Sequence, residues 1–368
     1  MLKVLAITSL LFIFPGLTIT NLPNTSPSPT PTKTPTLTLP PPPDAKTIPN
    51  EYFTSQSFNN CGPAALSMAL SYFGIQKSQE ELGQELRPYQ NPQGENDDKS
   101  VTLDELERKA QEYNLNTYHR PNGTIEILKK FIAQDIPVIT RTWLNINEDI
   151  GHYRIIKGYD NTTQVIIQDD SYQGKGLKFS YDDFTNMWSK YDSEYLVIFP
   201  KDKTKIVETI IGEDLNETTA WQKAVANNLK KLEITPDDIY TRFNLSVAYY
   251  HLKEFHKSVQ EFEKIESTLP PHTLWYQIEP IKSYYELGNY DKVLSLTDNI
   301  LNNGNRAFSE LYILRGEIYL KQKEKNSARQ EFEKAAIYNS NLYIFQYPAK
   351  KSDLIFPHFP PEFSISFQ

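Results

Sequence analysis

The chain has 368 residues, with 38 Lys and Arg against 46 Asp and Glu, and a formal net charge of −8. This length accommodates two ordinary domains with separate cores, since domains usually comprise about 100–200 residues. The basic residues are scattered, so no basic face is expected to collect phosphates, which argues against nucleic acid as a partner. Cys61 is the single cysteine and cannot form a disulfide within the chain.

The first 20 residues have the layout of an export signal. Lys3 supplies one positive charge, an apolar stretch follows from about residue 4 to 14, and Pro15 with Gly16 ends it. This stretch is shorter than the roughly 20 apolar residues that span a bilayer, and no Ala-x-Ala cleavage site follows it. We expect residues 1–20 to be a signal peptide or an uncleaved membrane anchor, and the protein to be extracellular or at the cell surface.

Residues 21–48 are dominated by Pro and Thr and contain few side chains that a core would bury. This composition favours an extended, polyproline-like linker. The linker is expected to separate the N-terminal segment from the folded part of the chain.

The region 49–202 changes period along its length. Helices are expected at about 62–73, over SVTLDELERKAQEYN and over TIEILKKFIAQD, because each has helix formers and start signals. The β-branched and aromatic runs IPVITRTWL, HYRIIKGYD, QVIIQD and EYLVIFP follow as expected strands. GKG at 174–176 is expected to be a turn. Helices followed by strands predict an α+β domain, with the first helix packed on an antiparallel sheet.

The region 213–345 lacks strand signals and repeats itself. Tyr249, Tyr284 and Tyr319 recur at a constant interval of 35 residues. Small residues keep the same interval, which predicts helix–turn–helix units that approach closely. NLSVAYYHLKEFHKSVQEFEKI and the two later units resemble tetratricopeptide repeats over roughly 239–342, and the resemblance implies an all-α solenoid. An irregular helical bundle is the alternative, and residues 346–368 are expected to be a C-terminal tail.

Cys61 lies in NNCGPAALSMALSYFG, residues 59–74, at the expected start of a helix. The partial positive charge at a helix N-terminus lowers the pKa of a thiol, and Gly62 leaves the sulfur uncrowded. The alternative is a buried, inert thiol. Export favours a reactive thiol, since an idle one is a liability in an oxidising compartment.

A reactive thiolate needs a histidine beside it and a group that orients the imidazole. His119, in NTYHRPNG, is expected to be a solvated loop residue. His152 opens a strand, and the following turn and strand return the chain, so that Asp169 or Asp170 can approach it. An edge-strand histidine without a chemical role is the alternative for His152.

The segments CGPAALSMAL, GHYRIIKGYD and VIIQDD together resemble the papain-like peptidases of the bacteriocin-processing (double-glycine leader) family, in its stand-alone branch without a transporter. The resemblance covers about 49–200 and implies a papain-like fold. It also implies Cys61 as nucleophile, His152 as general base and acid, and Asp169 as the group that orients His152. Gln56 and the Cys61 amide are implied as oxyanion donors.

The chain departs from this family at three positions. Gln56 lies five residues before Cys61, where the family usually has six, so Asn59 or Asn60 is an alternative donor. The usual Asp-Pro is Asp169-Asp170, which leaves either carboxylate able to orient His152.

Arg154 stands where an apolar residue is usual. Strand alternation would place its charge on the same side as the imidazole. A solvated edge arginine is expected, with binding of a substrate carboxylate as the alternative.

No set of residues has metal-ligand spacing and no Gly-rich phosphate loop is present, so we expect no metal and no cofactor. The prediction is an exported cysteine peptidase that hydrolyses peptide bonds, with helical repeats that bind the substrate or a protein partner. One alternative is an inactive peptidase-like domain in a cell-surface scaffold. Another keeps the thiol chemistry in a transpeptidase or amidase on cell-wall peptides.

Overall fold

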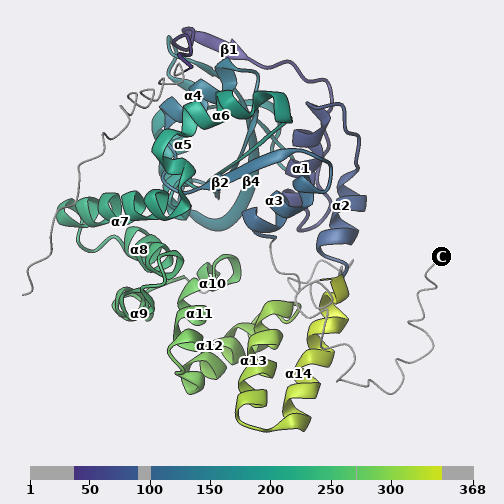
Figure 1. Cartoon of the computed structure of the whole chain (residues 1–368), viewed down its shortest axis with the longest axis vertical. Helices are drawn as coiled ribbons and strands as arrows, with labels where there is room; N and C mark the ends of the chain where they lie inside the picture. The colour runs from purple at the N-terminus through teal and green to yellow at the C-terminus, as the bar shows by residue number, and fades with distance from the viewer. Residues whose placement is uncertain (1–36, 90–100, 271, 342–368) are drawn as a thin grey trace, which may run out of the picture. The chain divides into compact units, whose positions relative to one another are not determined.

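The computed structural model describes residues 37–89, 101–270 and 272–341 (Figure 1). The predicted signal or anchor, most of the predicted linker and the predicted C-terminal tail lie outside these residues. Within the described ranges, no helix is both long enough and apolar enough to cross a membrane.

One antiparallel sheet of seven strands forms the centre of the N-terminal region. Its strands run in the order β2-β7-β3-β4-β5-β6, and β1 pairs with β4 beside this path. The predicted antiparallel sheet is therefore confirmed. The strands are β1 (Ala45–Thr47), β2 (Asn116–Arg120), β3 (Val138–Asn145), β4 (Glu148–Asp160), β5 (Val165–Asp170), β6 (Gly174–Ser180) and β7 (Tyr195–Phe199).

Two boundaries differ from the sequence prediction. The linker was expected to reach residue 48, but Ala45 already pairs with Asp160 at the end of β4. The pairing of β3 with β4 ends at Ile156. β1 supplies hydrogen-bond partners to the remaining part of the same edge of β4. GKG was expected to be a turn, but Gly174 opens β6, opposite Asp170.

Helices cover both faces of the sheet, which makes three layers. Because successive strand residues point to opposite faces, Ile155 packs with α1, α2 and α3, whereas Ile156 packs with α4, α5 and α6. The packing of the first helix on the sheet is confirmed. These helices are α1 (Cys61–Ser71), α2 (Gln79–Leu86), α3 (Leu103–Gln111), α4 (Ile125–Ala133), α5 (Tyr181–Trp188) and α6 (Thr204–Ile211).

Local signals explain where the helices of this region begin. Thr102 caps α3 through a capping box with Glu105, and Thr124 accepts the N–H of Ile127 at the start of α4. Helix α1 is different, because its first ten residues are all buried. A helix that is apolar on all sides belongs inside a core, so α1 holds its first residue deep in the protein.

The C-terminal region consists of helices that pack in consecutive pairs, as Figure 1 shows. They are α7 (Glu217–Ile234), α8 (Ile239–His251), α9 (Phe255–Glu263), α10 (Thr273–Tyr276), α11 (Glu279–Glu286), α12 (Tyr290–Asn302), α13 (Ser309–Lys321) and α14 (Lys325–Tyr338). Three described 3₁₀ turns are η1 (Ser189–Tyr191), η2 (Lys201–Lys203) and η3 (Gly212–Leu215).

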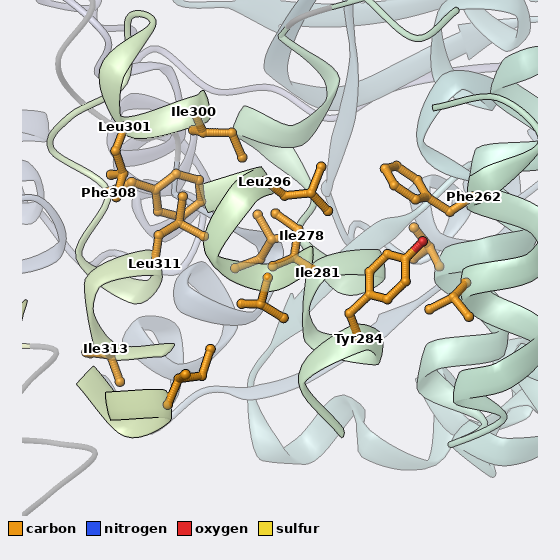
Figure 2. Packing of buried hydrophobic residues seen from close by; sticks show 14 of the residues in the cluster. Phe262, Ile278, Ile281, Tyr284, Leu296, Ile300, Leu301, Phe308, Leu311 and Ile313 are labelled. Atoms are coloured by element: carbon orange, nitrogen blue, oxygen red, sulfur yellow. The ribbon is translucent and has the colours of Figure 1, made fainter. Parts of the chain in front are cut away.

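Small residues of the repeat lie at close contacts between paired helices. A Cβ atom on Gly316 in α13 would lie 2.7 Å from the ring of Phe332 in α14. Ser246 in α8 donates to the carbonyl oxygen of Ser258 in α9 at 2.7 Å. Figure 2 shows the core of this region, where side chains such as Tyr284 fill the space between the helix pairs. The predicted all-α region is confirmed; that its pairs are tetratricopeptide repeats stays a prediction.

Candidate active site

Cys61 is the first residue of α1 and its side chain is buried. The thiol is a hydrogen-bond partner of the His152 imidazole, and the backbone N–H of Tyr153 also donates to it. Burial opposes ionisation of the thiol. The pKa is nevertheless lowered from its ordinary 9.0, because the hydrogen bond and charge of His152, the charge of Arg87 and the Tyr153 N–H together outweigh burial.

His152 lies in β4, opposite Thr142 of β3, and its ring is almost fully buried. Its Nε2 atom is 2.8 Å from Oδ1 of Asp170 at the end of β5, which leaves Nδ1 for the thiol. Burial lowers the pKa of His152, but the hydrogen bonds and charges of Asp170 and Cys61 raise it above the ordinary 6.5. A lowered thiol pKa beside a raised imidazole pKa favours a thiolate–imidazolium pair.

Asp169 was predicted to orient His152, and this prediction is wrong. The residue that contacts the imidazole is Asp170, which the sequence left open as the alternative. Asp169 instead binds Nζ of Lys157 at 2.6 Å and accepts the N–H of Gly176 at 2.8 Å. Neighbouring side chains on a strand point to opposite faces, so only one of the two carboxylates can face His152.

Arg154 was expected to be a solvated edge residue, and it is fully buried instead. Its Nε atom lies 3.0 Å from Oδ2 of Asp170. The guanidinium also donates to the carbonyl oxygens of Trp143 at 2.7 Å and Leu144 at 2.6 Å. Burial would raise the pKa of Asp170, but His152 and Arg154 together hold it below its ordinary value. Alternation along β4 was the signal that could have paired Arg154 with this carboxylate.

Gln56, the predicted oxyanion donor, is held by Ser171, the residue that follows Asp170 in sequence. Oε1 of Gln56 accepts the hydroxyl of Ser171 at 2.8 Å, and the Gln56 N–H donates to the Ser171 carbonyl at 2.9 Å. Within the described parts of the chain, no acceptor contacts Nε2 of Gln56, so both N–H bonds of this amide group are available as donors. Its role at an oxyanion stays a prediction.

The alternative donor Asn60 is already engaged. Its Nδ2 atom donates to the carbonyl oxygen of Gln79 at 2.9 Å and to Oε1 of Gln79 at 3.2 Å. The other alternative, Asn59, has a positive φ of 52° and makes the turn that leads into α1. We therefore retain Gln56 as the candidate donor.

Gln79 is a supporting residue that the sequence did not reveal. Its buried side chain accepts the Ser57 N–H at 2.9 Å and donates to the Thr54 hydroxyl at 3.1 Å. Together with the Asn60 contact, these bonds fix the loop 54–60, which carries Gln56 and leads into Cys61. Gln79 lies in the polar run SQEE, where nothing local distinguishes it from a solvated helix residue.

His119 was expected to be a solvated loop residue, and the structure contradicts this. It lies in β2, with Nδ1 at 2.7 Å from Asp104 and Nε2 at 2.9 Å from Glu194. Burial lowers the pKa of His119, but the two carboxylates raise it well above 6.5. The ligand atoms of Asp104, Glu107 and His119 lie within 4.8 Å of one another. An imidazolium held by two carboxylates offers no lone pair, so this set as arranged does not fit a metal ion.

A thiol at a helix N-terminus, an imidazole on a neighbouring strand and a carboxylate behind it are the groups that cysteine peptidases use. In the α+β region, His152 lies between the other two groups and interacts with both Cys61 and Asp170. Residues 46–196, which contain all three groups, match the model of the Peptidase_C39 like family. The matched segment is less than half of the chain, and α7 to α14 lie outside it.

Three solved structures are similar to this region, each with 18% sequence identity. A putative C39-like peptidase from Bacillus anthracis has a TM-score of 0.35, covering 43% of this chain and 99% of its own. The peptidase domain of Streptococcus ComA, a bi-functional ABC transporter involved in a quorum-sensing pathway, has a TM-score of 0.33, with 40% and 97% covered. A double glycine motif protease from an AMS/PCAT transporter, in complex with the leader peptide, has 0.32, with 42% and 95% covered. No curated protein matches the chain.

Proposed function

We propose that this protein is an exported, papain-like cysteine peptidase in which Cys61 is the nucleophile and His152 is the general base and acid. The observation that carries the proposal is the buried hydrogen-bonded chain from the Cys61 thiol through His152 to Asp170. The lowered pKa of the thiol supports it further, because the thiolate is the reactive form of cysteine.

In the acylation step, the Cys61 thiolate attacks the carbonyl carbon of a peptide bond and a sulfur–carbon bond forms. The oxygen of the tetrahedral intermediate carries the negative charge. His152 then gives its proton to the leaving nitrogen, the carbon–nitrogen bond breaks, and an amine departs. The products of this step are the free amine and a thioester on Cys61.

In the deacylation step, neutral His152 takes a proton from water, and the resulting hydroxide attacks the thioester carbonyl. The sulfur–carbon bond breaks and a carboxylic acid is released. The imidazolium and the thiolate are then restored. Asp170 holds the imidazole in the required orientation throughout, and Arg154 keeps Asp170 ionised.

Gln56 and the Cys61 N–H are the proposed donors to the oxyanion, a contribution worth about 3–4 kcal/mol for one donor. The contact of Gln56 with Ser171 supports this role, because it turns Oε1 toward the hydroxyl and leaves Nε2 as the free end of the amide. The substrate class that we propose is a peptide or protein, with the helical region binding the substrate or a protein partner.

Export through residues 1–20, by a signal peptide or a signal anchor, is part of the same proposal. The apolar stretch after Lys3 and the Pro/Thr-rich segment support it. Fractionation of cells that produce the full chain tests this part. Protein recovered only with the cytoplasmic fraction would contradict it.

The peptidase proposal is tested on the purified full chain with an epoxide or vinyl sulfone probe at neutral pH. We expect Cys61 to be labelled faster than free cysteine, and His152→Ala to abolish this advantage. Digestion of a peptide library, read by mass spectrometry with Cys61→Ser as the control, identifies cleaved bonds. An added amine that appears in the product indicates transfer. Labelling no faster than free cysteine, unchanged by His152→Ala, would refute the proposal and favour an inactive scaffold.

A further inference from the structure

A short segment of the helical region packs against β4 immediately before His152. We name residues 272–277 the α10 strap, because they contain α10 and the residues on either side of it. His272 Nδ1 lies 3.6 Å from Oδ2 of Asp149 in β4. At the other end of the strap, Gln277 donates to Glu194 at 3.0 Å. The strap is thus held to the sheet region at both ends.

Tyr276 makes the contact closest to the candidate site. A Cβ atom on Gly151 would lie 2.9 Å from Cδ1 of Tyr276 and 2.7 Å from the hydroxyl of Tyr191. The ring of Tyr276 therefore occupies the space that a side chain at position 151 would need. The backbone N–H of Gly151 also interacts with the Tyr276 phenol, which favours the ionised form of the phenol. Both contacts act on the residue directly before His152.

The backbone before His152 has a strand neighbour on one edge only. β3 pairs with β4 from Glu148 to Ile156, whereas β5 pairs with β4 only from Ile155 onward. Among the described strands, none lies on the second edge of residues 148–154. Tyr276 supplies a contact for the N–H of Gly151 in the part of β4 that the sheet supports least.

Arg141 fixes Tyr276 from the other side. Its side chain is buried, and it donates to the carbonyl oxygen of Tyr276 at 2.8 Å. The guanidinium carbon lies 4.6 Å from the ring centre of Tyr191, 5.5 Å from that of Tyr276 and 5.9 Å from that of Tyr153. Tyr153 in turn donates its N–H to Cys61. Arg141 therefore contacts Tyr276 of the strap as well as Tyr191 and Tyr153, which lie beside Gly151 and Cys61.

We propose that Tyr276 is a positioning residue for the proposed peptidase reaction, holding Gly151 and thereby the His152 imidazole against Cys61. The inference rests on the proposed function and deepens it. The helical region then forms part of the catalytic apparatus, in addition to any binding that it performs. A ligand of the helical region that displaces the α10 strap would lower the rate of the chemical step.

The test compares four single variants of the full chain and the double variant of Gly151→Ala with Tyr276→Ala. Tyr276→Phe keeps the ring and removes the phenol oxygen that interacts with the Gly151 N–H, whereas Tyr276→Ala removes both contacts. Gly151→Ala introduces a methyl group into the space of the ring. Tyr284→Phe is the matched control, because it removes one phenol hydrogen bond, 3.0 Å to Glu263, within the helical core.

Turnover of a cleaved peptide gives kcat and KM for each variant. We expect kcat to fall about 10- to 100-fold in Tyr276→Ala, as for a small displacement of a catalytic group, with KM nearly unchanged. Loss of this single polar interaction in Tyr276→Phe should reduce kcat about 5-fold. Tyr284→Phe should leave kcat and KM as they are.

Two readouts separate positioning from general stability. The acid limb of the pH dependence of Cys61 labelling should move to higher pH in Tyr276→Ala, because the thiolate loses part of its imidazolium partner. Gly151→Ala should also lower kcat less in the Tyr276→Ala background than in the native chain, which gives a non-zero coupling energy for the chemical step. A role in stability alone would leave the acid limb and the coupling energy measured from kcat of the folded variants unchanged.

The outcomes distinguish this inference from the proposed function. An active native chain whose Tyr276→Ala variant keeps kcat, KM and the acid limb would overturn the inference and leave the peptidase standing. A rise in KM alone would also overturn it, since Tyr276 would then contact the substrate. If Tyr276→Ala does not fold, equal kcat values for Tyr276→Phe and Tyr284→Phe would overturn it. A native chain with no enhanced thiol reactivity overturns both.

Discussion

Replacing Asp170 by Asn, with Asp169→Asn as a matched control, separates the two neighbouring carboxylates. Both are buried and both lose an ion pair with a buried cation, Arg154 for Asp170 and Lys157 for Asp169. Breaking a buried pair costs about 3–5 kcal/mol, so both variants should lose a similar free energy of unfolding. At the lower value, Tm falls by roughly 6–12 °C for a domain of 150–250 residues.

Only Asp170→Asn should affect the chemistry. The carboxylate of Asp170 raises the pKa of His152 and fixes its orientation through the 2.8 Å contact. The amide introduced by Asp170→Asn would carry no charge. Its N–H₂ group would also face Nε2 of His152, which carries a proton in the required tautomer and therefore needs an acceptor. In a hydrolase triad such a change lowers kcat by about 10⁴-fold. The pKa of His152 also falls, so the alkaline limb of the residual activity moves to lower pH.

The assay combines urea denaturation with kcat/KM measured across pH for the native chain and both variants. Asp169→Asn should lose stability while it keeps the native pH limbs and a rate close to native under conditions where it is folded. Equal loss of activity in the two folded variants would refute the assignment of Asp170. So would an Asp170→Asn variant with the native alkaline limb.

Three further predictions follow from the contacts around the site. Arg154→Met should lower the free energy of unfolding by about 3–5 kcal/mol, because Asp170 stays buried without its cation. The lowered pKa of Asp170 contributes stability that is lost as pH falls through the folded pKa. Without Arg154, acid unfolding followed by circular dichroism should therefore begin at higher pH. Gln79→Ala should leave the Ser57 N–H without its acceptor at a cost of about 1–3 kcal/mol and speed amide exchange in residues 54–60, whereas unchanged exchange would argue against its role in this loop. His119→Gln should destabilise the protein most below pH 6.5. The raised pKa of His119 contributes stability that is fully present there and is lost as pH rises through the folded pKa. Urea titrations at several pH values measure the loss, and a pH-independent difference between the variant and the native chain would contradict this prediction.

Local signals were sufficient for the helix that carries Cys61 and for the strand that carries His152. Pro63 marks a first turn, and the β-branched run after His152 marks a strand, so both groups could be placed before their contact was known. The choice between Asp169 and Asp170 could not be made in this way. It depends on the register of β5, where an irregularity in the pairing with β6 lies between Gln168 and Asp170.

The errors at Arg154 and His119 have the same physical origin. A charged side chain looks solvated when only its neighbours in sequence are considered, because burial of a charge is costly without a partner. The partners here are distant in sequence: Asp170 for Arg154, and Asp104 and Glu194 for His119. The packing of Tyr276 on Gly151 joins positions even further apart, and neither position carries a local signal for it.

The three-residue strand β1 has a protective consequence for the sheet. It covers the backbone groups of β4 from Gly158 to Asp160, where β3 no longer pairs. Proteolytic removal of the chain up to Thr47 would uncover a row of N–H and C=O groups between buried faces. Such an edge is a template for strands of other molecules, so a trimmed chain would be prone to self-association and aggregation.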